Sequence, residues 1–141
     1  MPALARLFLA LVLLAQGTAY CDVLGEADAR SIRAVIEAQL AAFAADDAQA
    51  AFAFASEGIQ QTFGTPENFL AMVRASYPVV YRPATVRFLD PEQIGDEIVQ
   101  AVEMADDKDR IWLALYRMQR QPDQSWRISG CVLTSSSQSR S

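Results

Sequence analysis

The stretch EIVQAVEMADDKDRIWLALYRMQRQPDQSWRISGCVL, residues 97–133, decides the fold of this chain. It alternates as β-strands do over three runs separated by the polar segments DDKD and QPDQ, and the runs cover 97–105, 110–120 and 125–133. Because connections this short join antiparallel neighbours, the stretch predicts a three-stranded antiparallel meander. The segment 84–89 predicts one further strand before it.

Two helices are predicted well before the strands. Apolar residues at three- and four-residue spacing predict the first helix over 27–45. The alanine-rich segment 48–56 predicts a second, short helix, with Asp47 as its cap and Gly58 just beyond its end.

A third helix is indicated by its two ends. Thr65 and Pro66 have the residue types of a helix start, and Pro78 stops the helix, so 78–83 is expected to be an extended connector. Helices that precede the strands, rather than alternate with them, indicate an α+β fold. We therefore expect N-terminal helices packed on one face of a curved, four-stranded antiparallel sheet.

The composition is that of one globular domain. The chain has 141 residues, 52% of them hydrophobic, a net charge of -5 and no histidine. An acidic chain without clustered Lys and Arg is a poor nucleic-acid binder, and the lack of histidine excludes Ser-His-Asp and Cys-His catalysis. We expect a single domain over 20–133, a disordered polar tail over 134–141, and neither a cofactor nor a metal.

The first 19 residues have the pattern of an export signal. Arg6 precedes the apolar run 7–15, and small residues then allow cleavage after Ala19. A membrane anchor is the alternative, but the run is shorter than the roughly 20 apolar residues that span a bilayer. The sequence therefore predicts a periplasmic or secreted protein without a membrane span in its mature chain.

The two cysteines, Cys21 and Cys131, stand at opposite ends of the mature chain. In an oxidising compartment they are candidates for one disulfide bond, and two unrelated thiols are the alternative. Lipidation of Cys21 is a second alternative, which Tyr20 disfavours because lipoprotein signals carry a small residue at that place.

The strand 110–120 is apolar on both faces. Trp112 and Ala114 alternate with Leu113 and Leu115 along it, yet the helices can cover only one face of the sheet. Large exposed apolar patches usually mark interfaces, so the pattern predicts a homodimer through the outer sheet face. Coverage of that face by a loop or by the N-terminal segment is the alternative.

The chain resembles a bacterial exported family catalogued as domain of unknown function 4864. The resemblance rests on the motifs QxxAFxxDD (39–47), AFxFAS (51–56), IQxxFGxPxxFxxMV (59–73), YxxVYRP (77–83) and WRIxGC (126–131). The order of helices and strands also resembles the nuclear-transport-factor-2-like, or cystatin-like, cone, whose members include ketosteroid isomerase and many binding domains. The resemblance implies this fold and export, and it implies no reaction.

From these features we expect a non-catalytic domain that binds a small apolar or amphipathic ligand or interacts with a partner. The residues expected to line its pocket are Phe63, Tyr77, Tyr81, Trp112 and Tyr116. One alternative is an isomerase- or dehydratase-type enzyme that uses a Tyr with a carboxylate such as Asp46, Asp47 or Glu103. Another alternative is a protein-binding accessory domain whose cone is filled by its own side chains.

Overall fold

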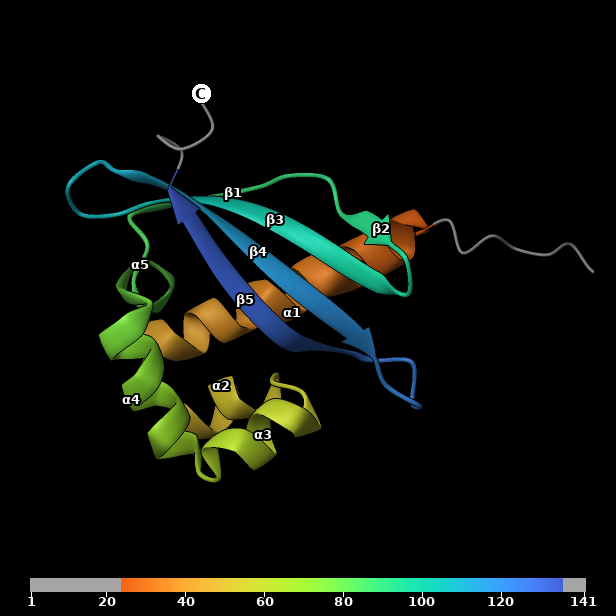
Figure 1. Cartoon of the computed structure of the whole chain (residues 1–141), viewed down its shortest axis with the longest axis horizontal. Coiled ribbons are helices and arrows are strands. Elements are labelled where there is room, and N and C mark those ends of the chain that lie inside the picture. Colours follow the sequence, from red (N-terminus) through yellow and green to blue (C-terminus); the bar gives the residue numbers. More distant parts are fainter. Residues whose placement is uncertain (1–23, 136–141) are drawn as a thin grey trace, which may run out of the picture.

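The protein, in a computed structural model, is described over residues 24–135 (Figure 1). The predicted export signal, Cys21 and residues 136–141 lie outside these residues. Five helices come first: α1 (Glu26–Ala44), α2 (Ala48–Ala53), α3 (Glu57–Phe63), α4 (Pro66–Ser76) and α5 (Pro78–Tyr81). The strands follow: β1 (Thr85–Phe88), β2 (Glu92–Ile94), β3 (Glu97–Ala105), β4 (Ile111–Arg120) and β5 (Trp126–Ser135). The predicted α+β order is thereby confirmed.

The sheet is antiparallel throughout. Strands β3, β4 and β5 form the predicted meander, and both β1 and β2 pair with β3, each along a different part of it. The β4–β5 register shifts between Arg117 and Met118, where β5 carries Ser129 as an extra residue. The free edge of β5 is paired locally with the chain after α2, because the Ser56 N–H donates to the Ile128 carbonyl at 2.8 Å.

Three short elements were not predicted, or were predicted wrongly. The helix predicted over 48–56 ends earlier, at Ala53. An unpredicted helix, α3, begins after Ser56, whose hydroxyl accepts from the Ile59 N–H at 3.4 Å, so Gly58 lies inside a helix and not beyond the end of one. Residues 78–81 form α5 and are not an extended connector, because Pro78 takes the first helical position, where its missing N–H costs nothing. Strand β2 has three residues, too few for a visible alternation.

The last strand also runs further than expected. Strand β5 includes Thr134 and Ser135, the first two residues of the segment assigned to the polar tail. Thr134 pairs with Leu113 of β4, and Ser135 pairs with Trp112. Strand β5 is longer than predicted because β4 is long enough to pair with these two residues.

The core lies between the helices and one face of the sheet. Helix α1 crosses that face, and α2 to α5 gather at one end of it (Figure 1). On α1, Ile32, Ile36 and Phe43 are buried, and they share one hydrophobic cluster with inward residues of the sheet such as Val102 and Ala114. Burial of such large apolar side chains supplies most of the stability of a domain of this size.

Candidate functional site

A cavity of about 260 Å³ lies between the helices and the sheet. Its walls come from α1, α3, α4 and the start of α5 on one side, and from β4 and β5 on the other. Its lining is mostly apolar and consists of Gln39, Phe43, Ile59, Phe63, Phe69, Met72, Val73, Tyr77, Val80, Tyr116, Arg117, Ile128, Ser129, Gly130 and Cys131. A space of this size admits a small organic molecule, since dry apolar cavities of about 150 Å³ already bind benzene.

One wall of the cavity is a cluster of phenylalanines. The Phe69 ring lies 5.9 Å from the Phe43 ring and 5.7 Å from the rings of both Phe52 and Phe63, measured between centroids, and all three pairs are tilted. These distances fall in the favourable range for aromatic pairs, and each such pair stabilises packing beyond its buried area. The cluster therefore gives the cavity a preformed wall.

The opposite wall carries a buried hydroxyl group without a hydrogen-bond partner. Tyr116 is 1% exposed, and its Oη has no partner among the described residues. Burial raises the pKa of this phenol well above its ordinary value, so the hydroxyl stays protonated and remains a donor. Leaving a polar group buried and unpaired costs about 1–3 kcal/mol of stability, so its presence in a folded protein calls for an explanation.

A cysteine lies opposite Tyr116 in the sheet. Cys131 on β5 is opposite Tyr116 in the β4–β5 register, and burial raises the pKa of its thiol to about 12. A thiol with so high a pKa is protonated and poorly nucleophilic at neutral pH. Cys131 is a free cysteine in the structure, and because Cys21 lies outside the described residues, their pairing stays a prediction.

The β-bulge forms part of the cavity lining. The Ser129 hydroxyl donates to the Arg117 carbonyl at 3.1 Å, which satisfies the backbone where the register shifts. Gly130 follows the bulge, and the Arg117 guanidinium lies directly against it, since a Cβ built on Gly130 would stand 2.6 Å from Arg117 Nη2. The absence of a side chain at this position therefore lets Arg117 lie flat on the outer face of the sheet.

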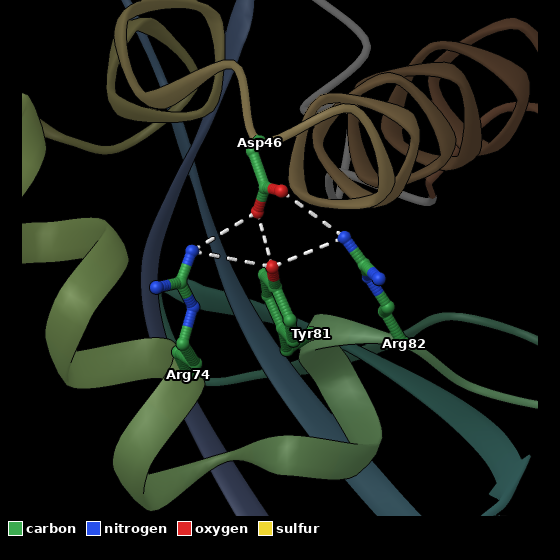
Figure 2. A network of polar contacts seen from close by, with 4 residues as sticks. All are labelled: Asp46, Arg74, Tyr81 and Arg82. Atoms are coloured by element: carbon green, nitrogen blue, oxygen red, sulfur yellow. Dashed lines mark hydrogen bonds and ion pairs between the residues drawn. The ribbon is translucent and has the colours of Figure 1, made fainter.

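A polar network ties together the helices that line the cavity. Figure 2 shows the Asp46 carboxylate facing the Tyr81 hydroxyl, with Arg74 and Arg82 on either side. The Tyr81 hydroxyl donates to Asp46 Oδ1, Arg74 Nη2 donates to the same oxygen at 3.2 Å, and Arg82 Nη2 donates to Oδ2 at 3.1 Å. Both guanidinium groups also lie over the Tyr81 ring, 5.2 and 4.8 Å from its centroid.

The electrostatics of this network favour its charged form. The hydrogen bond from Tyr81 is the largest influence, and with Arg74 and Arg82 it outweighs partial burial and lowers the pKa of Asp46. Asp46 has φ 52°, a left-handed conformation that Asp tolerates better than most residues and that ends α1. The network thus fastens the turn after α1 to α4 and α5, so it positions the cavity walls.

The structure brings together three of the five residues expected to line the pocket. Phe63, Tyr77 and Tyr116 line the cavity, whereas Tyr81 belongs to the Asp46 network. Trp112 lies apart from the cavity lining, and its indole N–H donates to Asp106 at 3.1 Å.

Sequence reasoning missed the polar residue of α1 that borders the cavity. Gln39 is buried, and its amide donates to the Ala51 carbonyl at 3.1 Å. A signal was present, because Gln39 follows Ile32 and Ile36 at helical spacing and therefore falls on the apolar face of α1. Cys131 gave no comparable signal, because its cavity neighbours come from helices distant in the sequence.

Three further acidic residues, two of them candidates from the sequence, have structural partners. Asp47 caps α2 as predicted, accepting from the Ala50 N–H at 3.1 Å. Glu103 lies on the outer face of the sheet, where Arg87 Nη2 donates to its carboxylate at 2.9 Å, so it does not reach the interior. Asp106 is 8% exposed, and burial by itself raises the pKa of its carboxyl group. Hydrogen bonds from Trp112, Arg110 and Lys108 outweigh burial and lower this pKa below its ordinary value.

A larger and more polar hollow of about 800 Å³ lies at the other end of the sheet, near the start of α1. Its one arginine is already engaged, because Arg120 forms an ion pair with Asp28 at 2.8 Å and bonds Gln124 at 2.9 Å. The same guanidinium covers the ring of Trp126 at 4.6 Å. Trp126 of this hollow also has a buried indole N–H without a partner among the described residues. The smaller cavity is the better candidate site because its lining is more apolar.

Two further findings concern the described residues as a set. None of the helices within 24–135 is long and apolar enough to cross a membrane. Over the same range, no three His, Cys, Asp or Glu side chains gather in a way that could hold a metal ion.

The structure thus defines the protein as an α+β domain with a small, mostly apolar cavity between its helices and an antiparallel sheet. Residues 25–141 match the family model described as Domain of unknown function (DUF4864), and the chain belongs to this family. A search of curated proteins and a search of solved structures each found no match. Several residues that carry the sequence resemblance line the cavity, among them Gln39, Phe63 and Cys131.

Proposed function

We propose that this protein binds a small, uncharged and largely apolar molecule in the cavity between its helices and sheet. The observation that carries the proposal is an apolar cavity lined by Tyr116, whose buried hydroxyl has no partner among the described residues. A ligand that accepts a hydrogen bond there would remove the cost of the unpaired donor. Pockets of this kind combine apolar walls with a few placed polar groups.

The chemistry of the lining favours one class of ligand. Because Tyr116 stays protonated, it would donate to a carbonyl, ether or hydroxyl oxygen. The phenylalanine wall around Phe69 would hold an aromatic or short aliphatic body. A ketone or ester carrying one such group fits both features, and the volume of about 260 Å³ limits its size.

The lining supports binding more than acid–base catalysis. An isomerase-type site needs a carboxylate next to its tyrosine, and the described lining of the cavity contains no Asp or Glu. Asp46, Asp47 and Glu103, which sequence analysis considered for this role, are engaged elsewhere. The open volume of the cavity also argues against a filled cone.

We further propose a nuclear-transport-factor-2-like cone and an exported protein as the setting of this site. Helices that precede an antiparallel sheet and cover one face of it, with a cavity between, support the first proposal. The sequence of residues 1–19 supports the second. A mass spectrum of protein from the periplasm, with the mass of a chain beginning at Tyr20, tests export, and a full-length mass contradicts it.

Matched probes test the binding proposal. We would titrate the protein with acetophenone, which carries a carbonyl acceptor, and with ethylbenzene, which has a similar shape without one, and follow the amide resonances of Gly130 and Cys131. We expect acetophenone to bind about threefold to tenfold more tightly, as one neutral hydrogen bond predicts. We expect this preference to vanish in Tyr116→Phe. The proposal fails if neither probe shifts these resonances, or if the preference survives in the variant.

A further inference from the structure

Gln39 is the polar side chain that α1 contributes to the lining of the cavity. The residue is 3% exposed and shares one face of α1 with the buried Ile32, Ile36 and Phe43. A buried amide needs hydrogen-bond partners for its nitrogen and for its oxygen, since a polar group left unbonded in the interior lowers stability. The amide of Gln39 has such a partner at one end only.

The nitrogen end of the amide is held by α2. Nε2 of Gln39 donates to the Ala51 carbonyl at 3.1 Å, and because a carbonyl oxygen only accepts, this contact fixes which end of the amide is the nitrogen. Within residues 24–135, no group donates a hydrogen bond to Oε1 of Gln39. No residue of α2 lines the cavity, so the nitrogen is directed away from the lining and the oxygen is the end left for a ligand.

Gln39 and Tyr116 have opposite hydrogen-bonding characters. The hydroxyl of Tyr116 has a proton to donate, whereas the amide oxygen of Gln39 only accepts. The two residues come from opposite walls of the cavity, Gln39 from α1 and Tyr116 from β4. A ligand with an acceptor oxygen alone would satisfy Tyr116 and leave the oxygen of Gln39 without a donor.

We infer that Gln39 determines the specificity of this cavity, by selecting neutral ligands whose polar group carries an N–H or O–H donor as well as an acceptor oxygen. The inference rests on the proposed binding function and narrows its ligand class. An amide or an alcohol on an aromatic or short aliphatic body supplies both groups, whereas a ketone or an ester supplies the acceptor only. A carboxylate is disfavoured, because its oxygens only accept and would face the oxygen of Gln39 without a proton between them.

Benzamide and acetophenone test the inference, because benzamide has an amino group where acetophenone has a methyl group. We would measure the Kd of both probes for the full chain, from the amide resonances of Gly130 and Cys131, in the wild type and in Gln39→Met. Methionine has a similar length and lacks the acceptor oxygen. We expect the ratio of the acetophenone Kd to the benzamide Kd to fall by about threefold to tenfold in Gln39→Met, as the loss of one neutral hydrogen bond predicts.

Tyr116→Phe is the matched comparison for this ratio. Both probes carry the same carbonyl group, so removal of the Tyr116 hydroxyl should weaken both by a similar factor and leave the ratio of the two Kd values unchanged. A purely structural role of Gln39 gives a different result as well. If its amide only holds the Ala51 carbonyl, Gln39→Met lowers the free energy of unfolding without changing the ratio.

A second measurement uses the wild type, so it does not depend on the folding of Gln39→Met. Isotope-labelled benzamide should show nuclear Overhauser effects from its amide protons to the Cγ protons of Gln39. An unchanged ratio in folded Gln39→Met, or labelled benzamide without contact to Gln39, overturns the inference while acetophenone binding still stands. If neither probe shifts the resonances of Gly130 and Cys131 in the wild type, the proposed function fails and the inference fails with it.

Discussion

Tyr116 on β4 and Cys131 on β5 are opposite each other in the antiparallel register, and both border the same cavity. Each carries a protonated polar group held in an apolar setting, as the raised pKa values of both groups indicate. This pairing places two protonated polar groups on the sheet side of the cavity, and the effect of each can be tested without knowing the ligand.

Replacing Tyr116 by Phe should stabilise the ligand-free protein. The change removes an unpaired buried hydroxyl and keeps the ring, so the free energy of unfolding should rise by about 1 kcal/mol. Chemical denaturation of the wild type and the variant measures the difference. Tyr77→Phe is the matched control, because that tyrosine also lines the cavity but its hydroxyl is not buried and unpaired. A loss of stability in Tyr116→Phe would mean that the hydroxyl has a partner in the native protein.

Truncation of Phe69 should damage both stability and the cavity. This ring packs against three other phenylalanines and is 6% exposed, so Phe69→Ala should cost about 3–5 kcal/mol. Phe69→Leu keeps most of the volume and should cost clearly less. Thermal and denaturant unfolding measure both variants, and equal costs for the two would show that the ring cluster does not act as described.

The Asp46 network should make part of the stability dependent on acid. Because the folded pKa of Asp46 lies below its ordinary value of 3.8, its contribution is present above about pH 4. That contribution is lost as the pH falls through the lower folded value. Asp46→Asn should therefore lower the unfolding midpoint at neutral pH, and the difference from the wild type should shrink in acid.

Asparagine also tolerates the left-handed backbone at position 46, so this variant isolates the charge. Asp106 has a lowered pKa as well, but it is present in both proteins and cancels in the comparison. A difference between Asp46→Asn and the wild type that stays constant from neutral pH into strong acid would show that the ionised carboxylate contributes nothing.

The Cys131 thiol should resist alkylation in the native protein. Because the pKa of this thiol is about 12, only about one Cys131 side chain in ten thousand is ionised at pH 8. In a Cys21→Ala variant, which leaves a single thiol, iodoacetamide should label the native protein far more slowly than the unfolded one. Rapid native labelling would place Cys131 in an accessible or ionised state, contrary to the structure.

Some features of the fold could be predicted because they are encoded locally. The strands β3 and β4 and the starts of α2 and α4 follow from alternation and from the capping residues Asp47 and Thr65. The short elements α3, α5 and β2 were missed or predicted wrongly, because their stability comes from neighbours elsewhere in the chain. The chain leading into α3, for example, is held where Ile128 N–H donates to the Phe54 carbonyl at 2.8 Å.

The sequence by itself determined the α+β class, the order of helices before strands and the apolar character of both sheet faces, since each depends on residues close together in the chain. Only the tertiary structure decided which residues form the cavity, because Gln39, Phe63 and Tyr116 meet through packing between distant segments. The tertiary structure also decided that Tyr81 and Tyr116 have different surroundings. Both are tyrosines in apolar surroundings in the sequence, but one has Asp46 as a partner and the other is buried without one.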